Sequence, residues 1–303
     1  MTGCITRVRP RMGTLLAVSL YGVDARSEPL EMREAFEIAQ RCETVMSREM
    51  PTSELNRLNR RAGRTVGIVS PELATVLRAA RRLAAATEGA FDPTIDALLR
   101  LWRHAERRGA APAPADLAAA CARVDWRAID VQDARVSLRR RGVRLNLGAF
   151  GKGVALDRIA CDLGRRGVSG LLNFGESSLR SVGRAPAKGW PILLRHPGGG
   201  FAGRFVLREG ACSTSAVYGQ AFRLGHRRIG HVLDPRRGTP VRADAQVTVL
   251  AASAAVAEAA STALLVLGAR AVDRIADRLR VAVCWIDRAG VRTTPGFTLE
   301  RTA

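Results

Sequence analysis

Apolar residues recur along this chain with spacings that are typical of helices in some stretches and of strands in others. In residues 152–166, Ala155, Ile159 and Leu163 are four positions apart, which places them on one face of a helix. Residues 31–46 show the same kind of alternation between apolar and polar positions. Both stretches are therefore predicted to be amphipathic helices, each with one face packed against a core.

The other signals do not alternate regularly between helix and strand. Ser70 and Pro71 are typical of an N-cap and a first-turn proline, and they predict a helix that runs to about Thr87. Residues 103–120 are rich in Ala, Arg and Pro, and they predict a surface excursion with one short helix. Adjacent strands and isolated helices favour an α+β fold with mixed sheets flanked by helices. The predicted strands are 12–20, 143–147, 170–174, 190–194, 205–208, 247–250 and 281–286.

The most apolar stretch, residues 247–269, admits two interpretations. It is 23 residues long with a single formal charge, Glu258, so its length is sufficient for a membrane span. However, residues 247–250 are largely β-branched, Ser253 can cap a following helix, and a carboxylate in mid-bilayer is costly. We therefore expect a buried strand followed by a buried helix, and a protein that does not span the membrane.

The charge balance is strongly basic, with 48 Lys and Arg against 28 Asp and Glu, a formal net charge of +20. Such a charge can indicate a nucleic-acid partner. The arginines are scattered, however, and aromatic residues that could stack on bases make up only 5%. We therefore expect no nucleic-acid partner. The only lysines are Lys152 and Lys188.

The length and the cysteines indicate a globular, reduced protein. A chain of 303 residues that is 47% hydrophobic can bury a large core, as one large domain or two fused subdomains. The six cysteines are far apart with no C-x-x-C pair, and no secretory leader precedes them. We expect reduced, mostly buried thiols in a cytoplasmic protein. A periplasmic or membrane-associated location stays open if a leader was removed.

Candidate chemistry is concentrated in residues 230–238 and 258–262. The first segment contains His231 and an Asp234-Pro235 turn, while Glu258 and Thr262 share one face of a predicted helix. Carboxylate and hydroxyl oxygens suit a hard cation such as Mg²⁺, and a phosphoryl reaction also needs a base near its nucleophile. The alternative is that His231 has only a structural role, as a hydrogen-bonded residue of a turn.

A second candidate is the glycine-bearing segment 148–153, which is predicted to connect a strand to a helix. Such a turn exposes backbone N–H groups at the positive end of the helix, where phosphate oxygens bind. Lys152 lies in this turn and offers a compact positive charge. The spacing is not that of a P-loop, so an ordinary turn is the alternative. For Ser47, Asp92 and residues 173–177, capping and turn roles are likewise the simple alternatives.

Six motifs in a fixed order resemble those of the ApbE-type FAD:protein FMN transferases, over about residues 12–268. Each motif alone is weak, whereas six in register are specific. They are Met12-Gly13-Thr14; Glu43-x-x-Met46-Ser47 with Ser53-Glu54-Leu55-x-x-Leu58-Asn59; Gly89-x-Phe91-Asp92-Pro93-Thr94-x-x-x-Leu98-x-x-Leu101-Trp102; Asn146-Leu147-Gly148-x-x-Gly151-Lys152-Gly153-x-Ala155-x-Asp157; Gly230-His231-x-x-Asp234-Pro235-x-x-Gly238; and Glu258-x-x-Ser261-Thr262.

The resemblance implies an ApbE-like fold, in which residues 1–11 form an N-terminal tail and residues 12–300 one domain of two tightly joined subdomains. It implies an enzyme that binds FAD with Mg²⁺, splits the pyrophosphate, attaches FMN to a Thr or Ser hydroxyl of an acceptor protein, and releases AMP. The implied acceptors are subunits of membrane electron-transfer complexes. By the same resemblance His231 is the base, and the metal ligands are Glu258, Thr262 and the Gly151 carbonyl. The implied cofactor-binding residues are Met12, Gly13, Thr14, Ser47, Asp92, Thr94, Lys152, Asp157 and Asp234.

The chain departs from the family pattern at several of these positions. Where the family has a metal-binding aspartate the chain has Glu258, whose extra methylene moves the carboxylate outward, and Mg²⁺ demands near-octahedral geometry. Asn146 likewise stands where the family has an aspartate. A homologue that binds FAD without transferring FMN, and an FAD pyrophosphatase that uses water as acceptor, are therefore the alternatives. The clustered departures favour weak Mg²⁺ dependence, with Glu258→Asp raising the rate of transfer.

Overall fold

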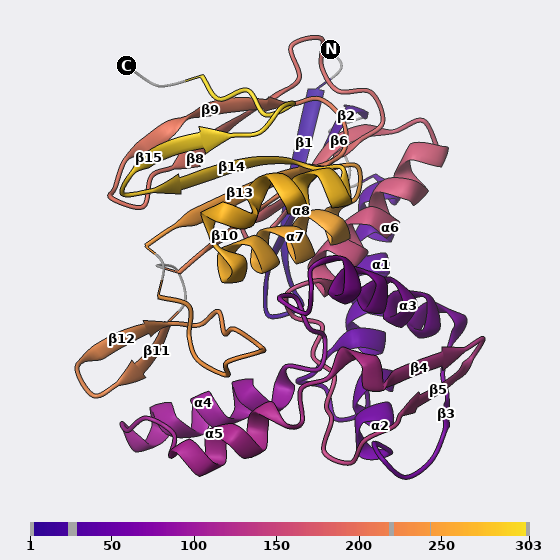
Figure 1. Ribbon diagram of the computed structural model, residues 1–303. Helices are drawn as coiled ribbons and strands as arrows, with labels where there is room; N and C mark the ends of the chain where they lie inside the picture. Colours follow the sequence, from indigo (N-terminus) through magenta and orange to yellow (C-terminus); the bar gives the residue numbers. More distant parts are fainter. Residues whose placement is uncertain (1–2, 24–28, 218–220, 243, 301–303) are drawn as a thin grey trace.

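The main feature of the fold is an eight-stranded antiparallel sheet (Figure 1). The computed structural model describes residues 3–23, 29–217, 221–242 and 244–300. The strand order is β1-β2-β6-β7-β10-β13-β14-β15, so distant parts of the chain become neighbours. These strands are β1 (Gly3–Arg11), β2 (Thr14–Val23), β6 (Ser169–Phe174), β7 (Ser178–Val182), β10 (Ala211–Ala216), β13 (Gln246–Ala251), β14 (Ala282–Asp287) and β15 (Gly290–Thr293).

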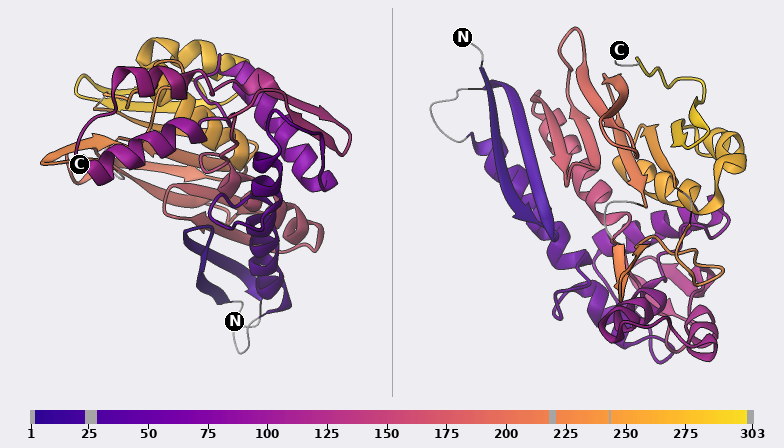
Figure 2. Two further views of the ribbon diagram at one scale, coloured as in Figure 1. Left: turned by 90° about the horizontal axis from the view of Figure 1, so that it is seen from below. Right: turned by 90° about the vertical axis from the view of Figure 1, so that its left-hand side faces the viewer.

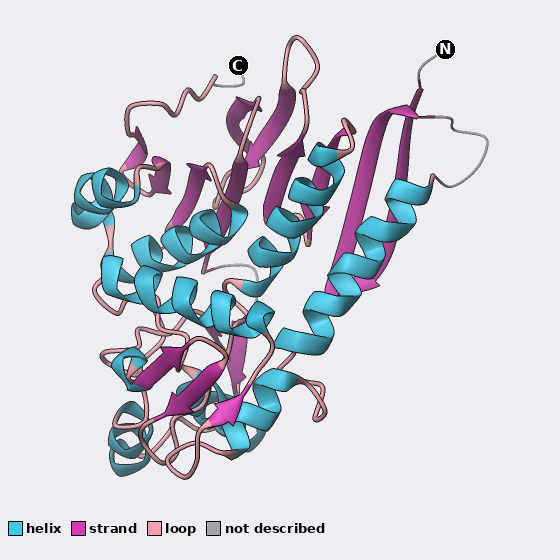
Figure 3. Ribbon diagram, turned by 90° about the vertical axis from the view of Figure 1, so that its right-hand side faces the viewer, coloured by secondary structure: helices cyan, strands magenta, loops and turns pink. Residues whose placement is uncertain are grey.

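Helices cover one face of this sheet in a single layer (Figure 3). Alternate residues of β2, namely Leu16, Val18 and Leu20, are fully buried and belong to the same apolar cluster as Phe36 on α1 and Leu156 on α6. This is the half-buried pattern that strand periodicity produces when one face of a sheet packs on helices. The covering helices are α1 (Leu30–Met46), α6 (Gly151–Arg165), α7 (Ala254–Leu267) and α8 (Val272–Leu279), the last preceded by a short 3-10 turn, Ala269–Ala271. Helix α3 (Pro71–Ala86) packs on α1, α7 and α8 and on the strand β4 (Ile129–Gln132) of a smaller sheet.

The opposite face is covered in part by a hairpin of β8 (Trp190–Arg195) and β9 (Phe201–Leu207), which the right-hand view of Figure 2 shows in front of the sheet. Trp190 and Phe205 from this hairpin share an apolar cluster with Leu179 and Ile286 of the sheet.

A smaller part of the molecule lies below the sheet in Figure 1. It contains a three-stranded sheet of order β3-β5-β4 and a separate hairpin, β11–β12. The hairpin packs on α4, where Phe222 stacks on Trp102 with ring centroids 6.1 Å apart. The elements are α2 (Glu54–Arg60), β3 (Gly67–Ile68), α4 (Asp96–Arg108), α5 (Pro114–Cys121), a 3-10 turn (Trp126–Ala128), β4 (Ile129–Gln132), β5 (Arg135–Leu138), β11 (Ala221–Leu224) and β12 (Arg227–Gly230).

Most of the predicted elements are present. The α+β class is confirmed, with antiparallel pairing throughout the described sheets. Helices α1 and α6 match their periodic patterns. At α3, Ser70 accepts a hydrogen bond from the backbone N–H of Leu73 and Pro71 stands in the first turn, as predicted. In place of one short helix, residues 103–120 contain the second half of α4 and most of α5.

The predicted strand at 143–147 is wrong. Val143 and Leu145 are fully buried, which explains the strand-like pattern. The side-chain amide of Asn59, however, accepts a hydrogen bond from the Leu145 N–H (2.7 Å) and donates one to its carbonyl (3.1 Å). A side chain thus satisfies the backbone groups that a neighbouring strand would otherwise pair. The glycine segment 148–153 consequently connects an extended segment, not a strand, to α6.

The assignment of residues 1–11 to a tail also needs correction. Residues 3–11 form β1, which pairs with β2 from Gly3↔Val23 to Arg11↔Thr14. The predicted strand at 12–20 is therefore shifted, because Met12 and Gly13 form the turn of this hairpin with φ of 49° and 76°. The pairing makes β1 the outermost strand of the large sheet.

Residues 247–269 form a strand followed by a helix, as predicted. Ser253 accepts a hydrogen bond from the N–H of Val256 and caps α7, which is 14 residues long. No helix among the described residues combines the length and apolar content that crossing a bilayer requires. All six cysteines are free thiols, although Cys4 and Cys161 are exposed and only three of the six are buried.

Candidate active site

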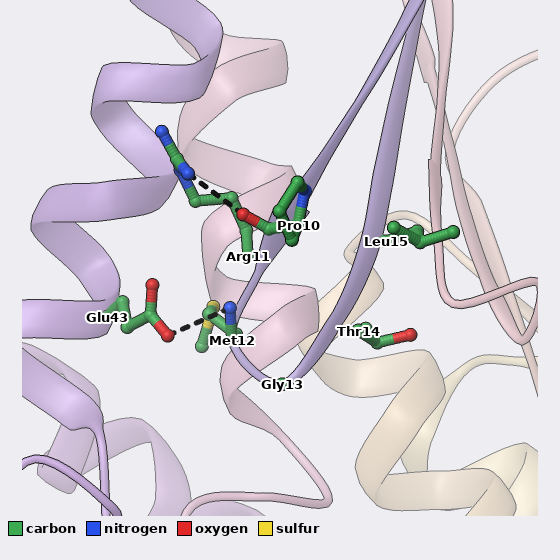
Figure 4. A pocket seen from close by; sticks show the side chains of 7 residues that line it. All are labelled: Pro10, Arg11, Met12, Gly13, Thr14, Leu15 and Glu43. Carbon is green, nitrogen blue, oxygen red and sulfur yellow. Dashed lines mark hydrogen bonds between the residues drawn. The ribbon is translucent and has the colours of Figure 1, made fainter.

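The β1–β2 turn brings Met12, Gly13 and Thr14 to one end of the sheet, beside a cavity of about 360 Å³ (Figure 4). The backbone N–H of Met12 donates to Glu43 Oε1 of α1 at 3.0 Å, so the turn is bonded directly to α1 at the wall of the cavity (Figure 4). The Met12 side chain reaches α6, since a Cβ on Gly151 would lie 3.3 Å from Met12 Cε. The turn therefore lies against the first residue of α6.

The start of α6 meets α7 and β7 through the carboxylate of Glu258. Glu258 is only 4% exposed. Its Oε2 accepts a hydrogen bond from the Gly153 N–H at 2.8 Å, and its Oε1 accepts one from the Ser178 hydroxyl at 2.6 Å. The Lys152 ammonium lies 3.7 Å from the same Oε1. These groups, together with the positive end of α6, offset the cost of burying the carboxylate.

Lys152 also faces the turn between β6 and β7. Its Nζ lies within hydrogen-bonding distance, 3.3 Å, of Ser177 Oγ. Thr14 approaches the same turn, because a Cβ added at Gly175 would lie 2.9 Å from Thr14 Oγ1. Three segments that are distant in sequence, the β1–β2 turn, the start of α6 and the β6–β7 turn, thus meet beside the N-terminus of α6.

Close packing of α6 on α7 fixes this arrangement. A Cβ at Gly153 would lie 2.5 Å from the backbone carbonyl of Ala254, so only glycine allows the two backbones to approach this closely. Asp157 caps α7 by accepting hydrogen bonds from the Ser253 hydroxyl (2.6 Å) and from the N–H groups of Ala254 (2.8 Å) and Ala255 (3.1 Å). The Asp157 carboxylate therefore caps α7, and it also lies 3.3 Å from the Arg180 guanidinium of β7.

Thr262 lies one turn after Glu258, and its hydroxyl is 3.5 Å from Ser215 Oγ. The carboxylate, this hydroxyl and the Gly151 carbonyl are hard oxygen donors, so their chemistry fits Mg²⁺. The described residues contain no cluster of three His, Cys, Asp or Glu side chains that could hold a metal alone. A cation here would need further oxygens, and Mg²⁺ commonly takes these from substrate phosphates and water.

Asp92 and Thr94 form a buried pair at the approach to α4. Asp92 accepts hydrogen bonds from the N–H (2.8 Å) and hydroxyl (2.6 Å) of Thr94 and from the Trp126 N–H (3.2 Å). Burial raises the pKa of Asp92 to about 6, although these hydrogen bonds act in the opposite direction. The Thr94 hydroxyl also accepts from the Asp125 N–H at 2.8 Å. The two side chains therefore connect the approach to α4 with the backbone at Asp125 and Trp126.

Ser47 performs the capping role that the simple alternative assigned to it. Its hydroxyl accepts hydrogen bonds from the N–H groups of Glu49 and Met50, both at 3.1 Å. Its carbonyl accepts from the Ser53 hydroxyl at 2.6 Å. Ser47 therefore shapes the connection between α1 and α2.

Asp96 is a site residue that the sequence analysis missed. It is fully buried at the start of α4 and pairs with Arg48 (3.3 Å) and Arg144 (3.2 Å). It also accepts a hydrogen bond from the Asn146 amide at 3.1 Å, and Asn146 in turn accepts from the Gly148 N–H at 2.9 Å. Through these bonds Asp96 joins α4 to the segment between α1 and α2 and to the glycine segment 148–153. In sequence it looks like any acidic residue of a first helical turn.

His231 follows β12 and is half-buried. Three residues later, Asp234 accepts hydrogen bonds at 2.9 Å from the backbone N–H and the guanidinium of Arg236. Burial acts to raise the pKa of Asp234, but the hydrogen bonds and charge of Arg236 outweigh it and leave that pKa below its usual value. The Trp102 indole N–H donates to the Gly238 carbonyl at 2.7 Å. Residues 231–238 are thus held mainly by α4.

The other contacts of this segment lead toward α7. Val232 packs against an apolar cluster that includes Ala257 and Ala260 of α7, the residues that directly precede Glu258 and Ser261. The segment that carries His231 therefore spans from α4 to the helix that carries Glu258 and Thr262.

Comparison with known proteins agrees with this geometry. The family model described as "ApbE family" matches residues 12–285. This chain belongs to the ApbE family. Relatives called FAD:protein FMN transferase include one from Rhodobacter capsulatus, 33% identical over 89% of this chain, and one from Treponema pallidum, 31% identical over 85% of this chain. The chain spans about half (52%) of the first relative's length and 77% of the second's.

The fold is shared with a solved structure as well. The ApbE protein of Thermotoga maritima superposes with a TM-score of 0.87 at 24% sequence identity, covering 99% of this chain and 100% of the other. At this level of identity the match establishes the ApbE fold.

Proposed function

We propose that this protein is an FAD:protein FMN transferase, which moves FMN from FAD to a Thr or Ser hydroxyl of an acceptor protein and releases AMP. The observation that carries the proposal is the meeting of Lys152, the N-terminus of α6 and Glu258 at one point. A lysine ammonium and a helix N-terminus both favour phosphate oxygens. Names of relatives that match most of this chain support the same activity.

In the proposed reaction the acceptor hydroxyl oxygen attacks the phosphorus on the FMN side of the FAD pyrophosphate. A new P–O bond forms to the acceptor, and the bond from that phosphorus to the bridging oxygen breaks. AMP leaves with the bridging oxygen, and the hydroxyl proton passes to a base. We assign this base to His231, which offers an imidazole on the segment between α4 and α7. Lys152 orients the pyrophosphate and offsets its charge.

Glu258, Thr262 and the Gly151 carbonyl are the groups that would hold Mg²⁺. The carboxylate has about four lone-pair positions, and its hydrogen bonds from Gly153 and Ser178 use two of them, so positions remain for a cation. A bound Mg²⁺ neutralises charge that develops on the pyrophosphate oxygens. We further propose that the acceptor is a flavoprotein subunit of a membrane electron-transfer complex.

The test is to incubate the purified chain with FAD, Mg²⁺ and an acceptor domain that contains a Thr or Ser flavinylation site. We expect mass spectrometry to find FMN on the acceptor and AMP in solution. His231→Ala should abolish transfer while FAD affinity changes less than about twofold, because a base acts on the acceptor proton. Free FMN and AMP with an unmodified acceptor would identify a pyrophosphatase. FAD binding without turnover would identify a binding homologue, and either result would contradict the proposal.

A further inference from the structure

The segment that carries His231 is anchored mainly on α4, rather than on α6 or α7, the helices that carry the phosphate-binding groups. Its preceding hairpin, β11–β12, pairs with no strand of the eight-stranded sheet among the described residues. Phe222 of β11 stacks on Trp102, and the Arg223 N–H donates to Glu106 Oε1 of α4 at 2.8 Å. On the other side of His231, Leu233 is buried in a cluster with Leu98 and Trp102. Both flanks of His231 thus rest on α4.

The 234–238 turn that follows His231 also packs closely on α4 and α5. Gly238 has φ of 70°, and a Cβ there would lie 2.5 Å from Cys121 Sγ and 3.0 Å from Leu98 Cδ2. Within the turn the Gly238 N–H donates to the Asp234 carbonyl (2.7 Å), and the Asp234 N–H donates to the Thr239 carbonyl (2.8 Å). These bonds transmit any displacement of Gly238 back to Asp234 and to the residues that precede it.

A hydrogen bond connects the 234–238 turn to α4. The Trp102 indole N–H donates to the Gly238 carbonyl at 2.7 Å, across 136 residues of sequence. Trp102 is 6% exposed, so its loss would leave a buried carbonyl without this donor. A tryptophan that served packing alone would need only an apolar ring, whereas this one also directs a donor at the histidine-bearing segment.

We propose that Trp102 is the positioning residue for His231: its indole holds the 234–238 turn against α4 and so places the imidazole opposite the phosphate-binding groups of α6 and α7. The inference rests on the proposed role of His231 as base. Trp102 itself touches neither FAD nor acceptor in this scheme. Its loss should therefore reduce the rate of the chemical step while FAD affinity is kept.

The chain offers a matched control. Trp190 is also 6% exposed, donates its indole N–H to Ser181 Oγ at 3.2 Å, and packs edge-on against Tyr21 with centroids 4.9 Å apart. It lies on the opposite face of the large sheet, in the β8–β9 hairpin. Trp102→Phe and Trp190→Phe thus remove the same donor from equally buried rings, and only the first loosens the His231 segment.

The experiment measures kcat for FMN transfer, the Kd for FAD and the rate at which diethyl pyrocarbonate modifies His231, the last by peptide mass spectrometry. We expect Trp102→Phe to lower kcat at least tenfold, to change the FAD Kd less than twofold, and to change the His231 modification rate severalfold. Trp190→Phe should leave all three near wild type. Phe222→Leu, which removes the ring stacked on Trp102, should act in the same direction as Trp102→Phe and replaces it if that variant does not fold.

Equal kcat in Trp102→Phe, Phe222→Leu and wild type would overturn the proposal, as would equal losses in Trp102→Phe and Trp190→Phe. A parallel rise in the FAD Kd would show that Trp102 shapes the flavin site instead. If the wild type transfers no FMN, the proposed function fails. The modification rate of His231 then still decides whether Trp102 positions it, because that readout needs no turnover.

Discussion

At the scale of single residues, the extra methylene of Glu258 determines which hydrogen-bond donors its carboxylate reaches. The longer side chain reaches the Gly153 N–H and the Ser178 hydroxyl at the same time, and it remains buried. An aspartate on the same helix would fall short of one of these donors. The contacts therefore favour the alternative in which the longer side chain is accommodated, and not the weak Mg²⁺ dependence that the sequence alone favours.

We accordingly expect Glu258→Asp to slow FMN transfer and Glu258→Gln to remove its dependence on Mg²⁺. The Gln amide can keep the bond from the Gly153 N–H only if its NH2 faces Ser178, whose hydroxyl must then turn to accept, and it loses the charge that faces Lys152, so we also expect about 1–3 kcal/mol loss of unfolding free energy. Transfer rates across a Mg²⁺ titration and urea unfolding measure the two effects. A Glu258→Asp variant faster than wild type would show instead that the native carboxylate is misplaced.

The raised pKa of Asp92 makes the stability of the protein depend on pH. Because the pKa in the folded state is about 6 and the ordinary value is 3.8, folding favours the protonated form. The stabilisation from this group is complete below about pH 4 and is lost as pH rises through 6. The two-unit difference sets an upper limit of about 3 kcal/mol.

Asp92→Asn tests this linkage by urea unfolding at pH 4 and pH 7. The unfolding free energy of wild type minus that of the variant should be larger at pH 4 than at pH 7, since only wild type loses the contribution. A difference that is constant over this range would mean that Asp92 titrates near its ordinary value in the folded protein, and one that grows with pH would mean that folding lowers its pKa.

At the scale of elements, the sequence was most informative where local signals determine structure. Periodicity located α1 and α6, and the capping residues Ser70 and Ser253 located the starts of α3 and α7. The strand predicted at 143–147 failed because the Asn59 amide, 86 residues away, satisfies the backbone of Leu145. No local pattern contains such a contact.

In the candidate site, too, the sequence indicated the residues that belong to motifs and missed those that act through tertiary contacts. The order of motifs brought out Lys152, Gly151 and Glu258, and the structure places Lys152 and Glu258 together beside the start of α6. Asp96 acts through partners 48 to 50 residues away, and the contact of Trp102 with Gly238 spans 136. Their roles depend on tertiary contacts, so spacing along the chain could not reveal them.

The contact between α6 and α7 provides a prediction at this scale. In Gly153→Ala the new Cβ would meet the Ala254 carbonyl at 2.5 Å, and backbone atoms cannot move aside as a flexible side chain can. The helices must separate, at a cost of about 1–3 kcal/mol in unfolding free energy, and the Gly153–Glu258 bond must lengthen. We therefore expect weaker FAD binding as well as lower stability.

Gly164→Ala is the control for this substitution, because it lies in the same helix with open space around its Cα. It should leave FAD affinity unchanged and raise stability slightly, by up to about 1 kcal/mol, through its higher helix propensity. Calorimetric titration with FAD and thermal unfolding compare the two variants. Equal effects of both substitutions would show that the α6–α7 contact is not what shapes the site.

At the scale of the whole molecule, the formal charge of +20 raises the question of how the proposed substrate FAD, an anion, would be recognised. A general positive field would attract any polyanion and would weaken with salt. The local alternative is that Lys152, at the start of α6 and 3.7 Å from Glu258, supplies the essential charge. The two lysines of the chain allow the alternatives to be separated, because Lys188 is exposed in the connection between β7 and β8.

Lys152→Gln and Lys188→Gln remove the same net charge from different places. In wild type, FAD at about 100 times its Kd should stabilise the folded state by about 2.7 kcal/mol, measured as a rise in the unfolding midpoint. We expect Lys152→Gln to lose most of this rise at both low and high salt, and Lys188→Gln to keep it. Equal, salt-dependent losses in both variants would show that FAD responds to the overall field of the protein, and the phosphate site at the start of α6 would then have to be abandoned.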